Sequence, residues 1–219
     1  MSAQDIPRAR AAILVFVRAP EAGRVKTRLA ASIGADAALN VYRRLAEHTV
    51  REALAVAGAE VRVHFTPADA EAGVRAWLGD GPALLPQADG DLGERMRGAF
   101  AWAFEDGHRR VVIIGSDLPE MRADLLGRAI TLLDDHQAVI GPARDGGYYL
   151  LGLTRLGEGV FEGIAWSTPG VLQATLERLA TAGITPALLE PLTDVDEVGD
   201  LPPGWLDASA FHVEHDRLS

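Results

Sequence analysis

Short aliphatic runs recur along the chain and alternate with longer segments of helical spacing. Uninterrupted apolar runs of this kind are typical of strands that are covered on both faces of a sheet. We therefore expect strands at Ala11–Val17, Val61–Phe65, Ala83–Leu85, Val111–Ile114 and Ala138–Ile140.

Between the strands, apolar residues recur at intervals of three and four positions, which predicts helices with one buried face. Such stretches lie around Leu39–Ala57, Met96–Ala103, Leu125–Leu133 and Val171–Leu179. The alternation of strands and helices predicts right-handed crossovers. We therefore expect an α/β fold of three layers, with a mostly parallel sheet and helices on both faces.

Composition narrows the class of protein. The 219 residues, 48% of them apolar, suit a single domain 1–219, with a core at about 11–201 and a short tail that begins in the Pro/Gly-rich stretch 199–204. The chain has no cysteine, which excludes disulfides and thiolate chemistry and fits a cytoplasmic location. A net charge of −10 argues against a nucleic-acid surface. The first apolar run is too short for a membrane span.

Ligands of open α/β sheets bind beyond the carboxyl ends of the strands, and a basic loop directly follows the first strand. Phosphate oxygens are bound by loop amides, an ammonium group and guanidinium forks. Neither the GxxxxGK[ST] nor the GxGxxG spacing is present, so a solvated basic turn is the alternative. The candidate phosphate ligands in this loop are Arg18, Gly23, Arg24, Lys26 and Arg28.

Carboxylates follow two other apolar runs. Asp117 lies in Gly-Ser-Asp-Leu-Pro after the strand Val111–Ile114, and Asp194 and Asp196 follow a later run. Hard cations such as Mg²⁺ take carboxylate ligands and share them with phosphates, so Asp117 and Asp196 are candidate metal ligands. Asp117 could instead cap a helix, and Asp194 or Asp196 could cap the last short helix. The six histidines have no metal-ligand spacing.

Three further places could face a ligand. Asp145, Gly146 and Gly147 allow close approach of the backbone to an acceptor, or form an ordinary β-turn. Gln87 could face a ligand, whereas Asp91 and Glu94 after it have the spacing of a capping box that starts the next helix. Trp166 could stack on an acceptor or pack in the core, and Ser167 or Thr168 after it could cap a helix.

Six segments together resemble a known family: FVRAPEAGRVKTRLA, QADGDLGERM, VVIIGSDLPE, GPARDGGYYLLGL, IAWSTPGVL and PLTDVDEVGDL. In this order, over residues 11–201, they are similar to a bacterial family of uncharacterised GT-A-like transferases, commonly labelled as glycosyltransferases associated with radical SAM/selenodomain proteins. The resemblance implies a mixed sheet of the nucleotide-diphospho-sugar transferase type. Asp117 would correspond to a metal-binding aspartate and Asp145 to an aspartate beside the acceptor.

Two reactions follow from the resemblance, both with Mg²⁺ or Mn²⁺. The first is glycosyl transfer from a nucleotide-diphospho-sugar to a small acceptor, with Lys26 at the leaving diphosphate and Asp145 as general base. The second is nucleotidyl transfer from a nucleoside triphosphate to a phosphate or carboxylate, with release of pyrophosphate. A nucleotide-binding protein without turnover is a third reading. The departure from Asp-Xaa-Asp, with Gly-Ser-Asp in its place, leaves the reaction open.

Overall fold

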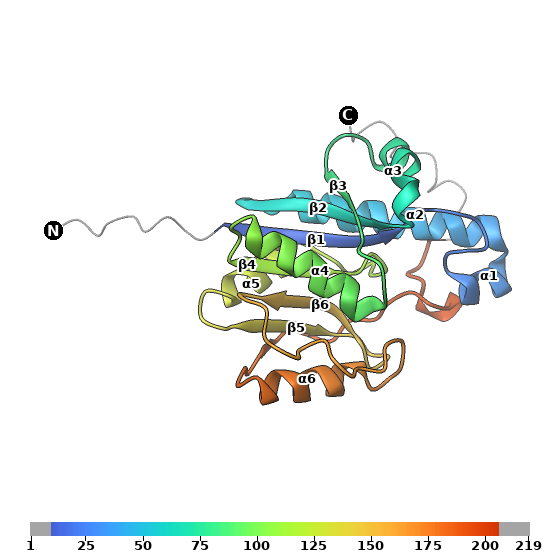
Figure 1. Cartoon of the computed structure of the whole chain (residues 1–219). Helices are drawn as coiled ribbons and strands as arrows, with labels where there is room; N and C mark the ends of the chain where they lie inside the picture. The colour runs from blue at the N-terminus through green and yellow to red at the C-terminus, as the bar shows by residue number, and fades with distance from the viewer. Residues whose placement is uncertain (1–9, 206–219) are drawn as a thin grey trace.

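The computed structural model describes residues 10–205, within which seven strands form one sheet in the order β3-β2-β1-β4-β6-β5-β7 (Figure 1). The strands are β1 Ala11–Arg18, β2 Ala59–Thr66, β3 Ala83–Pro86, β4 Arg110–Ile114, β5 Ala138–Pro142, β6 Tyr148–Leu153 and β7 Ala187–Leu188. All five strands expected from the apolar runs are present.

Most strand pairs are parallel. β1 pairs with β2 and β4, β3 with β2, and β7 with β5 in this way. β6 is antiparallel to both of its neighbours, β4 and β5, so the sheet is mixed, as the resemblance implied. The parallel arrangement of β1 and β4 brings the loops that follow them to one edge of the sheet.

Six α-helices lie within residues 10–205: α1 Thr27–Ile33, α2 Ala35–Leu54, α3 Glu71–Leu78, α4 Leu92–Glu105, α5 Ala123–Leu132 and α6 Val171–Thr181. Two 3-10 turns, η1 Ala68–Ala70 and η2 Val198–Asp200, complete the elements. The sequence predicted α2, α4, α5 and α6. It did not predict α1 and α3, because helices of seven and eight residues carry too few repeats of the apolar pattern to be recognised.

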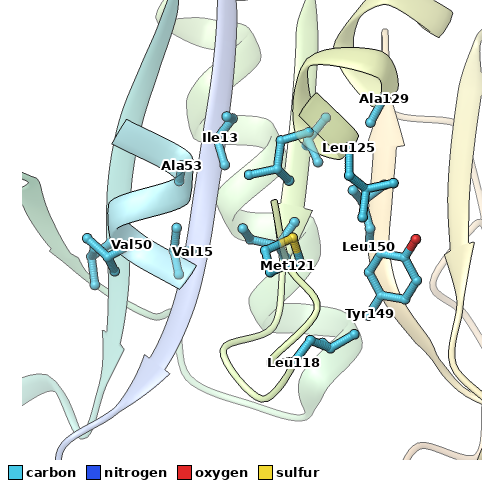
Figure 2. Close-up of a cluster of buried hydrophobic side chains, with 14 of the residues drawn as sticks. Ile13, Val15, Val50, Ala53, Leu118, Met121, Leu125, Ala129, Tyr149 and Leu150 are labelled. Carbon is cyan, nitrogen blue, oxygen red and sulfur yellow. The ribbon is translucent and has the colours of Figure 1, made fainter. Parts of the chain in front are cut away.

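The helices cover both faces of the sheet. Ile13 and Val15 of β1 pack with α2 and α5, as Figure 2 shows, whereas Leu14 of the same strand packs with α4 and α6 on the other face. This alternation follows from the two-residue period of a strand. Each fully buried aliphatic side chain contributes about 2 kcal/mol to folding, so the two faces together fix the three-layer arrangement.

The chain returns after β7 to the helices α1 and α2. Val195 is buried against them, and Leu201 and Trp205 pack on the same cluster. The guanidinium of Arg44 lies 4.3 Å from the Trp205 ring centroid. The stretch 199–204 therefore belongs to the packed structure, and the expected tail beyond Trp205 lies outside the described residues. No helix within residues 10–205 is both long and apolar enough to cross a membrane.

Candidate active site

Lys26 ends the loop after β1 and is the N-cap of α1, with a left-handed backbone conformation (φ 47°). Its side chain is only 5% exposed, and its Nζ lies 3.0 Å from Asp117 Oδ2 and 3.5 Å from Asp196 Oδ1. A buried ammonium needs such partners, because desolvation of an unpaired charge is costly. The fold thus joins one predicted phosphate ligand to both predicted metal ligands.

Asp117 follows β4 and stays free of helix capping. The next helix, α5, begins at Ala123 with Arg122 as its N-cap, so the alternative that Asp117 caps a helix is wrong. The carbonyl of Asp117 accepts the N–H of Val195 at 3.1 Å. This bond ties the C-terminal segment to the loop after β4 and brings Asp196 to the site.

The segment around Val195 alternates as an extended chain does. Val195 is buried against α1 and α2, whereas Asp196 is partly exposed and its Oδ2 accepts a hydrogen bond from Arg28 Nη1 at 2.9 Å. The 3-10 turn η2 is capped by Glu197 instead of Asp194 or Asp196, so that alternative is also wrong. The carboxylates of Asp194 and Asp196 are left for other partners.

Asp194 adds a further carboxylate to this region. Burial raises the pKa of Asp194, the negative charges of Asp145 and Asp196 raise it further, and Lys26 opposes the change. The carboxylate of Asp194 therefore lies close enough to Asp145, Asp196 and Lys26 for their charges to act on it. In the sequence, Asp194 pairs with Asp196 two positions later, and the two carboxylates were expected to be able to complete a metal site together.

The Asp145-Gly146-Gly147 turn has a defined structural role. Asp145 Oδ1 accepts the N–H of Gly147 at 2.9 Å, which is an Asx-type turn. Gly146 has φ 94°, and a Cβ there would lie 2.1 Å from the carbonyl oxygen of Pro169. These contacts match the alternative of a structural turn, and contact with an acceptor stays a prediction.

A cleft of about 630 Å³ opens at the carboxyl ends of β1 and β4. The predicted ligands that line it are Arg18, Arg24, Lys26, Arg28, Gln87, Asp117 and Asp196. The predicted residues that do not line it are Gly23, Asp145, Gly146, Gly147 and Trp166. Tyr42, Leu92 and Arg95 also line the cleft but were not predicted, because each lies on a helix, where its residue type reads as packing or as solvated surface.

Gln87 reaches the cleft with one side of its amide. Its Nε2 donates to the carbonyl oxygens of Val17 and His64, at 3.2 and 2.8 Å. Both amide hydrogens are therefore used to hold the ends of β1 and β2, and the side-chain oxygen is the atom left for a ligand. The predicted capping box of Asp91 and Glu94 is confirmed at the start of α4.

Trp166 packs against α4. A Cβ at Gly93 would lie 2.6 Å from the indole ring, so the two elements approach closely at this glycine. This contact matches the packing alternative for Trp166. The helix α6 begins at Val171 with Gly170 as its N-cap, so the predicted cap by Ser167 or Thr168 is wrong.

The donor set at Lys26 suits a hard divalent cation. Asp117 and Asp196 offer carboxylate oxygens, which Mg²⁺ and Mn²⁺ prefer. Their side chains are 41% and 40% exposed and share one ammonium group, so they lie close to each other at the cleft. The two residues present therefore fit the implied metal.

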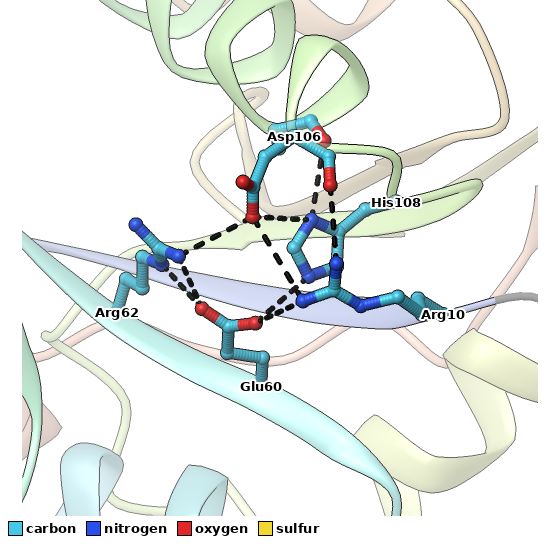
Figure 3. Close-up of polar contacts among 6 residues, drawn as sticks. Arg10, Glu60, Arg62, Asp106 and His108 are labelled. Carbon is cyan, nitrogen blue, oxygen red and sulfur yellow. Dashed lines mark hydrogen bonds and ion pairs between the residues drawn. The ribbon is translucent and has the colours of Figure 1, made fainter.

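A second polar cluster (Figure 3) lies near the amino ends of β1, β2 and β4, whereas the cleft lies at the carboxyl ends of β1 and β4. Glu60, Asp106 and His108 have ligand atoms within 4.8 Å of one another, a group that the spacing of histidines in the sequence did not reveal. Arg10 Nη2 lies 2.9 Å from Glu60 Oε2, and Arg62 Nη2 lies 3.4 Å from Asp106 Oδ2. The two guanidinium groups already balance the two carboxylates, which makes this an ion-pair network.

The mixed sheet is of the nucleotide-diphospho-sugar transferase type, and its site combines the cationic loop after β1 with Asp117 after β4 and Asp196 after β7. The chain belongs to the bacterial family described as "Uncharacterized protein conserved in bacteria (DUF2064)", whose model matches residues 49–168. A crystal structure from Desulfovibrio desulfuricans G20, provisionally assigned as a nucleotide-diphospho-sugar transferase, is 39% identical. The match covers 86% of this chain and 83% of that chain, with a TM-score of 0.82.

More distant solved structures share the fold. The 4-diphosphocytidyl-2C-methyl-D-erythritol synthase of Anaerococcus prevotii DSM 20548 is 11% identical, with 88% and 92% of the two chains covered and a TM-score of 0.60. Rv0371c of Mycobacterium tuberculosis H37Rv, solved in complex with manganese, is 15% identical, with 87% and 95% covered and a TM-score of 0.52. A search of curated proteins found no match.

Proposed function

We propose that this protein is a nucleotide-dependent transferase that moves a glycosyl group from a nucleotide-diphospho-sugar to a small acceptor. The observation that carries the proposal is the buried Lys26 ammonium between Asp117 and Asp196 at the carboxyl edge of the sheet. The relative from Desulfovibrio desulfuricans G20, with its provisional assignment as a nucleotide-diphospho-sugar transferase, supports the same class of reaction.

The cations of the cleft would hold the donor. Arg18, Arg24 and Arg28 line it together with Lys26, so a diphosphate would meet several positively charged side chains. When the bond between the anomeric carbon and the diphosphate oxygen breaks, the electron pair goes to that oxygen. Fixed cations stabilise the charge that develops there and lower the barrier.

Asp117 and Asp196 would hold the divalent cation, which adds Lewis-acid charge at the diphosphate. The acceptor oxygen forms the new bond to the anomeric carbon, and its proton passes to a carboxylate. We assign this role to Asp145, whose negative charge acts on Asp194 near Lys26. One oxygen of Asp145 holds the turn through Gly147, which leaves the other for the proton.

Nucleotidyl transfer is the second candidate, and the position of Asp145 favours it. Because Asp145 does not line the cleft, a reaction that needs no strong base suits the site. An acceptor phosphate or carboxylate is already ionised. Its oxygen would bond to the α-phosphorus of a nucleoside triphosphate while the bond to the β-phosphate breaks and pyrophosphate leaves with the electron pair.

The test uses the full chain with a panel of nucleotide sugars and nucleoside triphosphates, each with and without Mg²⁺ or Mn²⁺. Ligands that bind the folded state raise its thermal stability and select the substrates for product analysis. Release of a nucleoside diphosphate supports glycosyl transfer, and release of pyrophosphate supports nucleotidyl transfer. Binding without either product would support a nucleotide-binding protein without turnover and contradict the proposal.

Asp117→Asn tests the site assignment. It removes the charge that would hold the metal while keeping the shape of the side chain, so turnover should fall at least about 100-fold. Asp124→Asn is the matched control, because it replaces the same type of side chain at an exposed position of α5. Full turnover of Asp117→Asn would contradict the assignment.

A further inference from the structure

We propose that Lys26 acts as an internal counter-cation, which keeps the divalent metal from binding alone and couples metal binding to the binding of the nucleotide phosphates. The inference rests on the proposed function, because it takes Asp117 and Asp196 as the metal ligands. Its basis is the position of the ammonium, 3.0 Å from one carboxylate and 3.5 Å from the other.

Burial commits Lys26 to these carboxylates. With 5% of its side chain exposed, the ammonium has little water to replace a lost partner. A divalent cation on Asp117 and Asp196 would add two positive charges beside it and take away its partners. The metal alone is therefore expected to bind weakly, since like charges at this range repel strongly where solvent is limited.

A diphosphate or triphosphate changes this balance. Its oxygens bring negative charge to the cleft that Lys26 lines, and they offer the ammonium new partners. Asp117 and Asp196 then become available to the metal without leaving a buried charge unpaired. Metal and phosphates should thus bind with positive coupling, which by linkage is the same in both directions.

Other cations of the loop have different surroundings. Arg24 pairs with Glu21 instead of with a metal ligand, and its side chain is 66% exposed. Arg28 pairs with Asp196 but is 73% exposed, so water can solvate it when the pair opens. Because Lys26 is buried, separating its ammonium from the carboxylates costs more free energy than it does for the exposed Arg24 and Arg28. The coupling is therefore assigned to this residue.

The experiment measures the affinity of the full chain for Mn²⁺ alone, by electron paramagnetic resonance of the free ion. Lys26→Met should bind Mn²⁺ at least about tenfold more tightly than the wild type, because the competing charge is gone. Arg24→Met removes the same charge from the same loop and should change the affinity less than about threefold. Lys26→Arg keeps the charge and should bind as weakly as the wild type.

Adding Asp117→Asn to Lys26→Met should abolish the gain in affinity, which locates the bound ion. Equal Mn²⁺ affinity of a folded Lys26→Met variant and the wild type would overturn the proposal. If Lys26→Met does not fold, the wild type still provides a test. Its thermal stabilisation by MnCl₂ and sodium pyrophosphate together should exceed the sum of the separate effects, and simple additivity would overturn the coupling.

The two proposals fail in different ways. If the substrate panel yields no product but Lys26→Met binds Mn²⁺ about tenfold more tightly, the proposed function fails and the role of Lys26 is supported. If products form but Lys26→Met binds Mn²⁺ no more tightly than the wild type, the role of Lys26 is overturned and the function stands.

Discussion

The hydroxyl of Tyr42 is bonded to both backbone groups of Arg18, accepting the N–H and donating to the carbonyl at 2.7 Å each. Tyr42 lies in α2 and Arg18 is the last residue of β1, so one helix residue fixes the point where the basic loop leaves the sheet. Burial raises the pKa of Tyr42 well above its ordinary value, although the bond to Arg18 opposes the change. The hydroxyl therefore remains a donor at all ordinary pH values.

Tyr42→Phe should destabilise the protein by about 1–3 kcal/mol, because it leaves two backbone groups of the loop without a partner. The free energy of unfolding in urea measures this loss, and thermal shifts with the best ligand of the nucleotide panel should show weaker binding. Tyr148→Phe is the matched control. Its hydroxyl contacts the sulfur of Met96 at 3.7 Å, a weak acceptor, so the loss should stay below about 1 kcal/mol. Equal losses would contradict the role of Tyr42.

Substitutions at Gly146 and Gly23 distinguish the effect of a steric clash from that of backbone strain. Both have positive φ, 94° and 76°, but a Cβ at Gly146 would lie 2.1 Å from the Pro169 carbonyl, whereas a Cβ at Gly23 has no atom within 4 Å. Gly23→Ala should cost about 1 kcal/mol of strain. Gly146→Ala should cost at least about 2 kcal/mol more, because the backbone must shift. Denaturant unfolding of both variants checks this, and similar losses would contradict the close approach.

His64 makes stability depend on pH. It is buried in β2, its ring stacks on Phe16 at 5.6 Å between centroids, and its Nε2 has no hydrogen-bond partner within residues 10–205. Burial, followed by the charge of Arg62, lowers the pKa of His64 to about 4. The unfolded chain, with a histidine pKa of about 6.5, binds the proton more readily. The contribution is therefore present above about pH 6.5 and is lost as the pH falls toward about 4, by up to about 3 kcal/mol.

His64→Leu removes this group and should flatten the pH dependence of stability. Between pH 7 and pH 4.5, the wild type should lose about 2–3 kcal/mol more than the variant, as measured by urea unfolding at each pH. His136→Leu is the control, since His136 is exposed and its replacement should leave the pH dependence unchanged. A variant at position 64 with the wild-type pH profile would show that another group governs the acid range.

The apolar pattern alone determined the layers of this fold. Runs such as Ala11–Val17 are short and aliphatic, which is typical of a strand covered on both faces of a sheet, and β1 is such a strand. The capping box of Asp91 and Glu94 was equally readable, because its partners are three residues apart. The positions of the basic loop and of Asp117 followed from the rule that ligands lie beyond the carboxyl ends of strands.

The partners of the site residues were decided by the tertiary structure. The sequence predicts Lys26 as a phosphate ligand, yet in the fold its ammonium forms ion pairs with Asp117 and Asp196, which are distant along the chain. Gln87 donates its amide hydrogens to backbone carbonyls at the ends of β1 and β2. Glu60 contacts His108 near the amino end of β2. The spacing of apolar residues predicts which side chains are buried, because the direction of the side chains repeats regularly along a helix or a strand. Which charge pairs with which depends on strand order and on the return of the C-terminal segment, and no local pattern encodes these.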